Sequence, residues 1–323
     1  MSVLQALGLD EIRRQEATSA MTNGAVLGRV IRVDRGMATL ETEDGPIRVD
    51  NVAEPFLTVG DWALIGEATI RLERRTELVR RSGYRRDARQ IMAANVDAIL
   101  VVRALDTEVR VNRLSTLVVI AHESGAVPLV VLTKADESPN VEAACAMVHE
   151  GLPGVEVMAV SVTSGFGLPE LREWVRDKTV VLLGESGAGK STLTNWLLGE
   201  EHLLTTAVRR DGQGRHTTTH RELVVIPGGG VVIDTPGIRE AAAFGEGEGV
   251  ELAFADLAEL AAICRFSDCS HQNTPGCAID EAVKSGTVDE TRVAQFLEEL
   301  EGRAWIAERL ELRARAAKRG RRR

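Results

Sequence analysis

Short apolar runs alternate with amphipathic stretches through the middle of the chain. The apolar runs cover residues 96–102, 128–132, 155–160 and 179–183, and a stretch with helical spacing follows each of them. Strands that alternate with helices in this way are typical of βαβ units, in which the strands form a parallel sheet. The pattern therefore predicts an α/β fold with a doubly wound parallel sheet over residues 90–243.

The part of the chain before this sheet has two other patterns. Residues 1–22 carry apolar side chains at Leu4, Leu7 and Ile12, and this spacing predicts a short helical extension. Residues 23–89 begin with several short β-type segments separated by Gly and Pro turns and end in an Arg-rich stretch. We expect a small OB-like β-barrel followed by a basic linker.

The last 80 residues form a third block. Residues 250–262 and 288–318 have helical spacing, and a basic tail follows. Between the two helical stretches lies a cluster of cysteines. We therefore expect residues 244–323 to be a helical, metal-binding domain with a basic tail.

Charge is unevenly distributed over the 323 residues, whose formal net charge is −9. Residues 71–89 hold eight Arg against three acidic residues, and residues 313–323 hold seven basic residues and no acidic one. Basic segments on an acidic body favour contact with a phosphate backbone at defined places. The alternative is a solvated helix face and a disordered tail. The expected barrel has only Phe56 and Trp62 for base stacking, so backbone contact is the expected mode.

Length and hydropathy fit a soluble protein of two or three domains. The composition is 44% hydrophobic, which is enough for a large core. No apolar run approaches the roughly 20 residues that a membrane-spanning helix needs. The first residues lack a basic region before an apolar stretch, so they do not resemble a signal peptide. We expect a cytoplasmic protein.

A complete phosphate loop follows the apolar run at 179–183. It has the form G-x-x-x-x-G-K-S and opens a predicted helix. The backbone N–H groups of such a loop bind phosphate oxygens, its Lys reaches the outer phosphates and its Ser ligates Mg²⁺. The nucleotide-binding residues predicted here are Gly184, Glu185, Ser186, Gly187, Ala188, Gly189, Lys190, Ser191 and Thr192.

Two further motifs identify the nucleotide. Asp234 and Gly237 form a D-x-x-G element after an apolar strand, where Asp holds Mg²⁺ and the Gly N–H meets the γ-phosphate. Thr133, Lys134 and Asp136 form a T-K-x-D element in place of N-K-x-D. An Asp carboxylate accepts two hydrogen bonds from guanine, whereas adenine offers no such pair of donors and leaves the carboxylate unpaired. The pair of motifs predicts a guanine nucleotide.

The order of the motifs is permuted. Residues 161–164, beginning with Ser161 and Val162, resemble the loop that closes over guanine. Both base-specificity elements precede Gly184, whereas Ras-like GTPases have the phosphate loop first. A domain with neighbouring termini tolerates such a rearrangement. The segment after Asp234 then leads directly into the last domain.

A polar loop at residues 208–222 lies where GTPases carry switch I. One Thr of this switch ligates Mg²⁺ in the GTP state. We favour Thr218 and keep Thr217 and Thr219 as alternatives. An ordinary polar connection is the other interpretation.

Three of the four cysteines and one His fall within fourteen residues. A Cys₃His set is a standard tetrahedral site for structural Zn²⁺, and clustered Cys in a cytosolic chain favours metal over disulfides. Chance clustering is the alternative, since the spacing lacks a C-x-x-C pair. The remaining Cys145 is expected to be a small core residue. The predicted zinc ligands are Cys264, Cys269, His271 and Cys277.

Together these motifs resemble the ribosome small subunit-dependent GTPase A (RsgA) family over residues 25 to 300. The resemblance implies an N-terminal barrel, a circularly permuted GTPase domain and a C-terminal zinc module. It implies hydrolysis of GTP to GDP and phosphate, stimulated by the 30S ribosomal subunit late in its assembly through 16S rRNA binding. We also expect one structural Zn²⁺, Mg²⁺ with GTP or GDP and no contact with a membrane, and a monomer is the default for a factor that docks on a large particle.

Two positions bear on nucleotide affinity and catalysis. Thr133 stands where the family has an Asn that ties the specificity element to the phosphate loop, so we expect guanine specificity through Asp136 with weaker affinity. Ile238 stands where Ras-like enzymes have the Gln that orients water, which predicts slow intrinsic hydrolysis. The ribosome or another residue would then assist, and His216 is the candidate.

Two other functions stay open on the sequence. One is an assembly factor whose output is nucleotide-switched binding, with hydrolysis only resetting it. The other is a small-molecule kinase or ATPase that uses the phosphate loop. The T-K-x-D element argues against the second.

Overall fold

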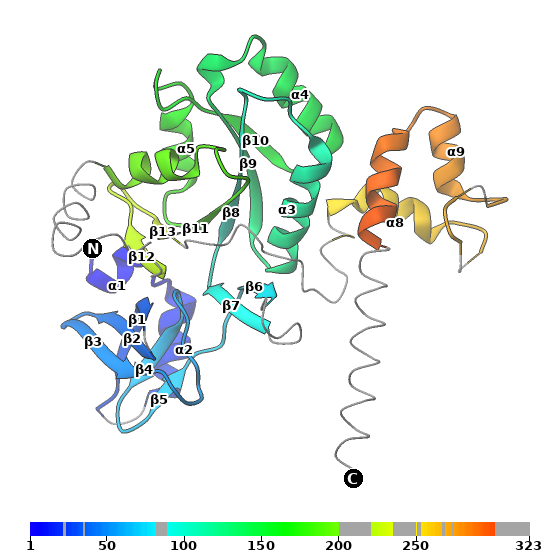
Figure 1. The fold of residues 1–323 in the computed structure, drawn as a ribbon. Helices are drawn as coiled ribbons and strands as arrows, with labels where there is room; N and C mark the ends of the chain where they lie inside the picture. The colour runs from blue at the N-terminus through cyan, green and yellow to red at the C-terminus, as the bar shows by residue number, and fades with distance from the viewer. Residues whose placement is uncertain are drawn as a thin grey trace.

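The structure is a computed structural model, and it describes residues 1–21, 24–34, 36–81, 89–199, 221–234, 250, 253–266, 269–272 and 274–300. Figure 1 shows its three parts: N-terminal strands with two helices, a central α/β unit, and a small helical module toward the C-terminus. No helix in these ranges is long and apolar enough to cross a membrane.

The central unit is a parallel sheet, as predicted. Its strand order is β10-β9-β8-β11-β13, and all four of these pairings are parallel. The bounds are β8 (Ala98–Ala104), β9 (Val127–Thr133), β10 (Glu156–Ala159), β11 (Thr179–Leu183) and β13 (Val231–Asp234), and the antiparallel β12 (Arg221–Val225) extends the sheet beyond β13.

Helices cover both faces of this sheet. The elements are α3 (Val111–Glu123), η1 (Ala135–Glu137), α4 (Val141–Gly151), α5 (Leu168–Trp174) and a helix at residues 190–199. Alternate residues of β8 point to opposite faces: Ile99 and Val101 pack with α3 and α4, whereas Leu100 and Val102 pack with α5 and the helix at 190–199. A strand buried on both faces explains the continuous apolar run in the sequence.

The N-terminal part contains the expected helices and strands. They are α1 (Val3–Ala6), α2 (Glu11–Ala20), β1 (Val26–Asp34), β2 (Met37–Thr42), β3 (Gly45–Asp50), β4 (Trp62–Ile65) and β5 (Thr69–Arg71). The strands pair antiparallel in the order β3-β2-β1-β4-β5, and β1 also pairs with β12, which joins this part to the central sheet. Closure into an OB-like barrel stays a prediction. Trp62 is buried and Phe56 is half exposed.

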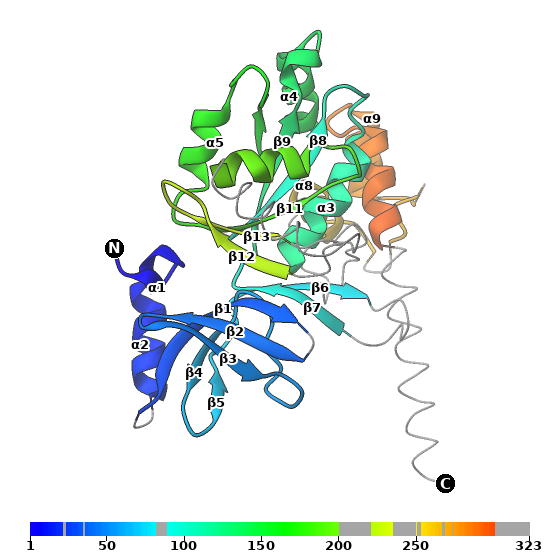
Figure 2. The ribbon, with the colours of Figure 1, turned by 60° about the vertical axis from the view of Figure 1, so that its left-hand side comes forward.

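Two details in this part differ from the sequence pattern. Ile12, one of the apolar positions of the expected extension, is 63% exposed, whereas its neighbour Arg13 is buried. The Arg-rich segment, for which a solvated helix face was the alternative interpretation, contains β6 (Glu77–Arg81), which forms an antiparallel hairpin with β7 (Arg89–Ala94). Figure 2 shows this hairpin at the junction between the N-terminal strands and the parallel sheet.

A buried Arg joins the N-terminal part to the start of β11. The Arg29 guanidinium donates to the Thr179 hydroxyl at 2.9 Å, to the Asn95 carbonyl at 3.1 Å and to the Leu7 carbonyl. Burial lowers the pKa of Arg29 to about 10. The Asn95 side chain also accepts from the Arg13 guanidinium at 2.8 Å, so one polar cluster connects α1, α2 and β1 to the central sheet.

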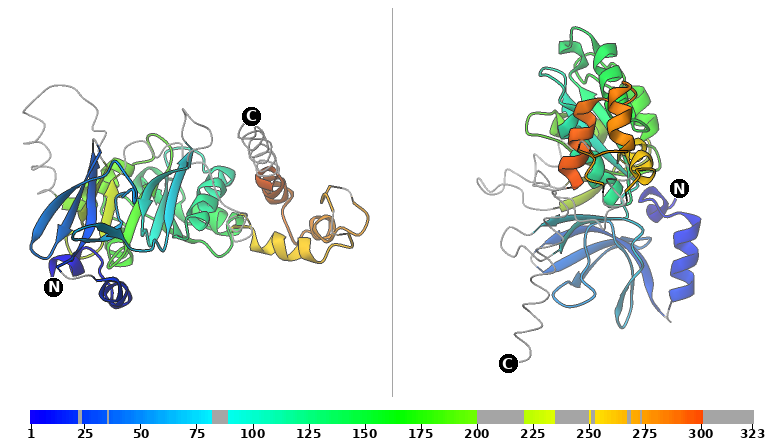
Figure 3. Two further views of the ribbon diagram at one scale, coloured as in Figure 1. Left: turned by 90° about the horizontal axis from the view of Figure 1, so that it is seen from below. Right: turned by 90° about the vertical axis from the view of Figure 1, so that its right-hand side faces the viewer.

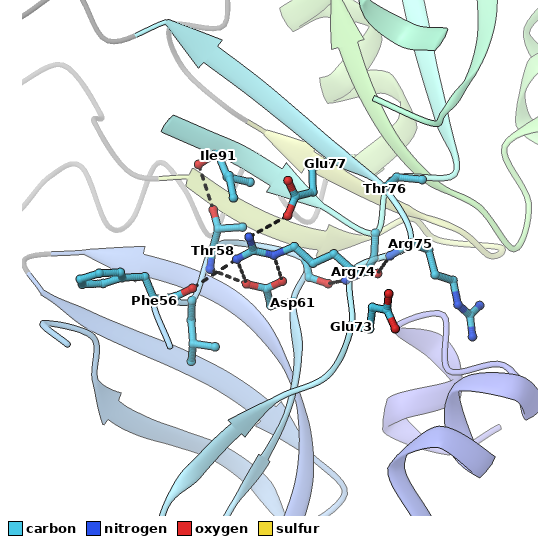
Figure 4. A network of polar contacts seen from close by, with 12 residues as sticks. Phe56, Thr58, Asp61, Glu73, Arg74, Arg75, Thr76, Glu77 and Ile91 are labelled. Atoms are coloured by element: carbon cyan, nitrogen blue, oxygen red, sulfur yellow. Dashed lines mark hydrogen bonds and ion pairs between the residues drawn. The ribbon is translucent and has the colours of Figure 1, made fainter. Parts of the chain in front are cut away.

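A second Arg is buried beside the hairpin. Figure 4 shows Arg74 forming a two-pronged ion pair with Asp61, through contacts of 2.6 and 2.7 Å. Arg74 also contacts the Glu77 carboxylate at 3.0 Å, and Asp61 accepts from the Thr58 backbone N–H at 2.8 Å. The Asp61 side chain has no exposed surface. Part of the Arg-rich segment therefore has a structural role.

The C-terminal module packs beside α3 and α4. It contains α8 (Ala255–Ala262), α9 (Ala278–Lys284) and a helix at residues 290–300. Figure 3 shows it on the side of the central unit away from the N-terminal strands. Arg292 pairs with Asp256 at 2.6 Å and donates to the carbonyl of Gly151 at the end of α4.

Candidate nucleotide site and metal centre

The carboxyl ends of the parallel strands bring the nucleotide motifs together. β11 ends at Leu183, immediately before Gly184, and β9 ends at Thr133. β13 ends at Asp234, and its pairing of Val232 with Val180 puts Asp234 on the same edge of the sheet. Open α/β sheets bind their ligands at this edge.

The phosphate loop is held against β8 by a very close approach. A Cβ added at Gly184 would lie 2.2 Å from the Val102 carbonyl oxygen, and the φ of Gly184 is +149°. The Lys190 ammonium donates to the carbonyl of Gly184 at 2.7 Å and to that of Glu185. Without a nucleotide, the ammonium group of Lys190 thus bonds to carbonyls of the loop itself. A phosphate would be a stronger acceptor, because it is charged.

Thr133 links the guanine-specificity element to the phosphate loop. Its hydroxyl donates to the Ala188 carbonyl at 2.7 Å, and the side chain is buried. A Cβ added at Gly189 would lie only 3.1 Å from this hydroxyl oxygen. The shorter side chain therefore reaches the loop, and the reason for expecting weaker affinity no longer holds.

The rest of the specificity element presents its polar groups outward. Lys134 has a φ of +56° and pairs with Asp106, and this hydrogen bond raises the pKa of Lys134. Asp136 lies in η1 and is exposed. The Ala135 N–H donates to the Val160 carbonyl at 3.1 Å, which ties this element to the end of β10.

The loop after β10 is folded on a buried Ser. The Ser161 hydroxyl accepts from the Ser164 backbone N–H at 3.0 Å, and the Ser161 side chain is fully buried. Val162 is half-buried and follows directly. The predicted residues of this loop therefore lie beside the specificity element. His216, Thr218 and Gly237, together with Thr217, Thr219 and Ile238, lie outside the described residues.

The ion pairs of Glu185 in the phosphate loop were not predicted from the sequence. Glu185 is paired with Arg103, at the end of β8, and with Arg113, on α3. The hydrogen bond from Arg113 lowers the pKa of Glu185 despite some opposing burial. These three side chains line a cavity of about 430 Å³ beside the loop. The spacing of the three residues along the chain does not reveal their contact.

The four predicted zinc ligands lie together. Their ligand atoms are all within 4.8 Å of one another. The Cys264 sulfur lies 3.5 Å from the His271 Nδ1 and 3.9 Å from the Cys277 sulfur, and the last two atoms are 3.7 Å apart. Tetrahedral Zn²⁺ with bonds of about 2.3 Å to sulfur and 2.0 Å to nitrogen requires edges of about 3.5 to 3.8 Å. The Cys264, His271 and Cys277 atoms lie close to these edges, and the set of four is compatible with the ion. Cys145, outside it, packs half-buried against the core.

The comparisons with known proteins agree with this geometry. A model of the RsgA GTPase family matches residues 71–244, more than half of the chain. The chain belongs to the RsgA GTPase family. It is therefore a GTP-hydrolysing enzyme, as predicted.

Relatives match the chain over nearly its whole length. An RsgA of Streptomyces coelicolor, named small ribosomal subunit biogenesis GTPase RsgA, is 42% identical over 98% of this chain and 90% of its own. A Vibrio vulnificus protein named small ribosomal subunit biogenesis GTPase RsgA 2 is 37% identical. The match covers 94% of this chain and 89% of the Vibrio protein.

Two solved structures have the same fold. YjeQ from Thermotoga maritima aligns with a TM-score of 0.64 and 23% identity, over 86% of this chain and 98% of that one. YloQ, described as a circularly permuted GTPase, aligns with a TM-score of 0.61 and 23% identity, over 87% of this chain and 96% of that one. The RsgA member described here thus has the permuted GTPase fold that the order of its motifs predicted.

Proposed function

We propose that this RsgA GTPase acts in late assembly of the small ribosomal subunit, which stimulates its hydrolysis of GTP. The observation that best supports binding of a guanine nucleotide is the contact of Thr133 with Ala188, because it joins the guanine-specificity element to the phosphate loop. The printed names of the relatives support the ribosomal role, since they are called small ribosomal subunit biogenesis GTPases.

In this proposal the guanine base lies between Asp136 and the loop that starts at Ser161 and Val162. The phosphates occupy residues 184–192, where backbone N–H groups and the Lys190 ammonium bind them. Lys190 exchanges its present carbonyl partners for phosphate oxygens, which is favourable because the acceptor is charged. The proposed roles of Thr218 and Gly237 at the γ-phosphate, and of His216 in assisting hydrolysis, stay as predicted.

The end of β13 offers a carboxylate for Mg²⁺. Asp234 is exposed at the carboxyl edge of the sheet, and Ser191 lies in the first turn of the helix at 190–199. A carboxylate and a hydroxyl are the hard ligands that Mg²⁺ takes together with phosphate oxygens. With Mg²⁺ bound there, negative charge on the phosphates is neutralised. Asp234 and Ser191 would hold the ion, with Thr218 joining in the GTP state.

One structural Zn²⁺ would be held by Cys264, Cys269, His271 and Cys277. The edges of the ligand set support this, as does the closed, four-ligand composition. The Phe296 ring lies 6.5 Å from the His271 ring and 5.7 Å from the Phe254 ring, so the site is packed against the helices of its module. Purified protein should contain about one equivalent of zinc, and Cys277→Ser should lose it. Zinc-free protein with unchanged helical content would overturn this part.

Contact with 16S rRNA is proposed through basic side chains. Arg74 and Arg75 are engaged in ion pairs with Asp61 and with Asp10, so they are poor candidates. The proposal therefore rests on the rest of the Arg-rich segment and on the tail at 313–323. The N-terminal strands, as an OB-like barrel, would lie against the RNA backbone. A monomer would dock on the subunit.

The test is GTP hydrolysis by the protein alone, with 30S subunits and with 50S subunits, using ATP as the control nucleotide. We expect slow turnover alone, strong stimulation by 30S subunits, little by 50S subunits, and no ATP hydrolysis. Hydrolysis that 30S subunits do not stimulate would overturn the proposed ribosomal activation while leaving the GTPase assignment intact.

A further inference from the structure

An acidic residue lies inside the phosphate loop. Glu185 follows Gly184 directly, and its backbone carbonyl accepts from the Lys190 ammonium. Its carboxylate therefore sits beside the segment that has to receive the phosphates. A negative charge so close to a di- or triphosphate opposes nucleotide binding.

Two guanidinium groups meet this carboxylate, one on each oxygen. Arg103 bonds to Oε2 and Arg113 to Oε1. They come from different elements, since Arg103 lies near the end of β8 and Arg113 lies in the first turn of α3. The hydrogen bond from Arg113 and the charge of Arg103 lower the pKa of Glu185, so the carboxylate is fully ionised at neutral pH.

We propose that Arg103 and Arg113 determine nucleotide affinity by compensating the charge of Glu185 in the phosphate loop. They are positioning residues, because they act through Glu185. This inference rests on the proposed placement of the phosphates on residues 184–192. It adds two affinity-determining residues outside every nucleotide motif of the sequence.

The exposure of these groups separates this role from a structural one. The side chains of Arg113 and Glu185 are 57% and 39% exposed. Ion pairs this open contribute little to folding. Loss of Arg113 should therefore hardly change the melting temperature, whereas an uncompensated carboxylate beside the phosphates should weaken binding. Arg103 is less suited to a test, since it also donates to the Glu108 carbonyl at 2.7 Å and its loss would disturb that loop.

Arg110 provides a matched control. It lines the same cavity as Arg113 and is 56% exposed. Its partner, however, is Glu108, at 3.9 Å, and not the phosphate loop. Removing Arg110 takes away the same charge from the same cavity without freeing Glu185.

The experiment measures GDP affinity by titration of a fluorescent GDP analogue. The proteins compared are wild type, Arg113→Gln, Arg110→Gln, Glu185→Gln and the Glu185→Gln/Arg113→Gln double variant.

We expect Arg113→Gln to bind GDP about tenfold more weakly, which is a loss of about 1.4 kcal/mol in binding free energy. Arg110→Gln should stay within about twofold of wild type, Glu185→Gln should bind more tightly, and the double variant should recover wild-type affinity. The loss in Arg113→Gln should shrink as salt is raised, because screening weakens the repulsion.

A structural role gives the opposite pattern. If Glu185 only holds the loop in place, Glu185→Gln weakens binding and the double variant is no better than Arg113→Gln, which overturns the inference. Equal losses in Arg110→Gln and Arg113→Gln overturn it as well. A wild-type protein that binds no GDP would instead refute the proposed nucleotide site, so the two failures are distinguishable.

Discussion

The Thr133 hydroxyl donates a hydrogen bond of 2.7 Å to the Ala188 carbonyl oxygen, and this contact joins the end of β9 to the phosphate loop. The same hydroxyl lies 3.4 Å from the Arg103 carbonyl. A residue of the T-K-x-D element thus positions a residue of the phosphate loop, although the two are 55 positions apart in the chain. A bound nucleotide would therefore contact two linked segments, with its base on the T-K-x-D element and its phosphates on the phosphate loop.

The first prediction concerns this hydroxyl. Thr133→Val keeps the shape of the side chain but leaves the buried Ala188 carbonyl without its donor, which costs about 1–3 kcal/mol. We expect GDP affinity to fall about tenfold or more, measured by titration. Thr133→Ser, which keeps the hydroxyl, should stay close to wild type. Thr133→Asn should bring no gain, because the Thr133 hydroxyl already makes the contact with the phosphate loop, and a marked gain would contradict this view.

The position of the nucleotide motifs at one edge of the sheet follows from the sequence, because they lie at strand ends. Residues 184–192, Thr133 and Asp234 follow apolar runs, and a parallel sheet brings such ends to one edge. Contacts between side chains do not follow from periodicity. The pairing of Glu185 with Arg103 and Arg113 depends on how β8, β11 and α3 pack, so no spacing in the chain reveals it.

The second prediction concerns the close packing of the phosphate loop on β8. In Gly184→Ala the new methyl group would lie 2.2 Å from the Val102 carbonyl oxygen, so the backbone has to move. We expect loss of nucleotide binding and a lower melting temperature. Gly187→Ala is the control for the melting temperature, since its φ is also positive, at +84°, but its Cβ would meet nothing within 4 Å. It should cost only about 1–2 kcal/mol for the unfavourable φ. Equal falls in melting temperature for the two substitutions would refute the steric argument.

The third prediction concerns the buried pair of Arg74 and Asp61. Arg74→Ala leaves the Asp61 carboxylate buried without its charged partner, which destabilises proteins by about 3–5 kcal/mol. Urea unfolding followed by circular dichroism would measure the loss. Arg75→Ala is the matched control, because Arg75 is the next residue and its pair with Asp10 is exposed. It should cost less than about 1 kcal/mol. A loss for Arg74→Ala as small as that for Arg75→Ala would show that the buried pair contributes little.

Buried arginines are also where the sequence misleads. A helical spacing of apolar residues puts Ile12 inside, yet Arg13 occupies that place, because the Glu73 carbonyl and Asn95 satisfy its guanidinium. Arg29 is buried by the same means. Residue type alone assigns arginines to the surface. Only the carbonyls and carboxylates that surround them, contributed by distant segments, reverse that preference.

The last prediction concerns pH and the start of α2. Asp10 accepts from the Arg13 backbone N–H at 2.6 Å as the N-cap and also pairs with Arg75. The hydrogen bond from Arg75 is the main cause of the lowered pKa of Asp10, against some burial. A carboxyl with a lowered pKa in the folded state stabilises the fold above its unfolded pKa of about 3.9, and this stabilisation is lost as the pH falls through the folded value.

Two substitutions separate the charge of Asp10 from its capping role. Asp10→Asn keeps a good N-cap and loses the charge, so at pH 7 it should cost less than about 1 kcal/mol, since the pair with Arg75 is exposed. Asp10→Ala loses the cap as well and should cost about 1 kcal/mol more. In urea unfolding from pH 7 to pH 3, the gap between wild type and Asp10→Asn should begin to narrow near pH 4 and keep narrowing toward pH 3. The gap between Asp10→Asn and Asp10→Ala should persist, because an amide does not titrate. A gap between wild type and Asp10→Asn that stays constant down to pH 3 would mean that the charge of Asp10 contributes nothing to stability.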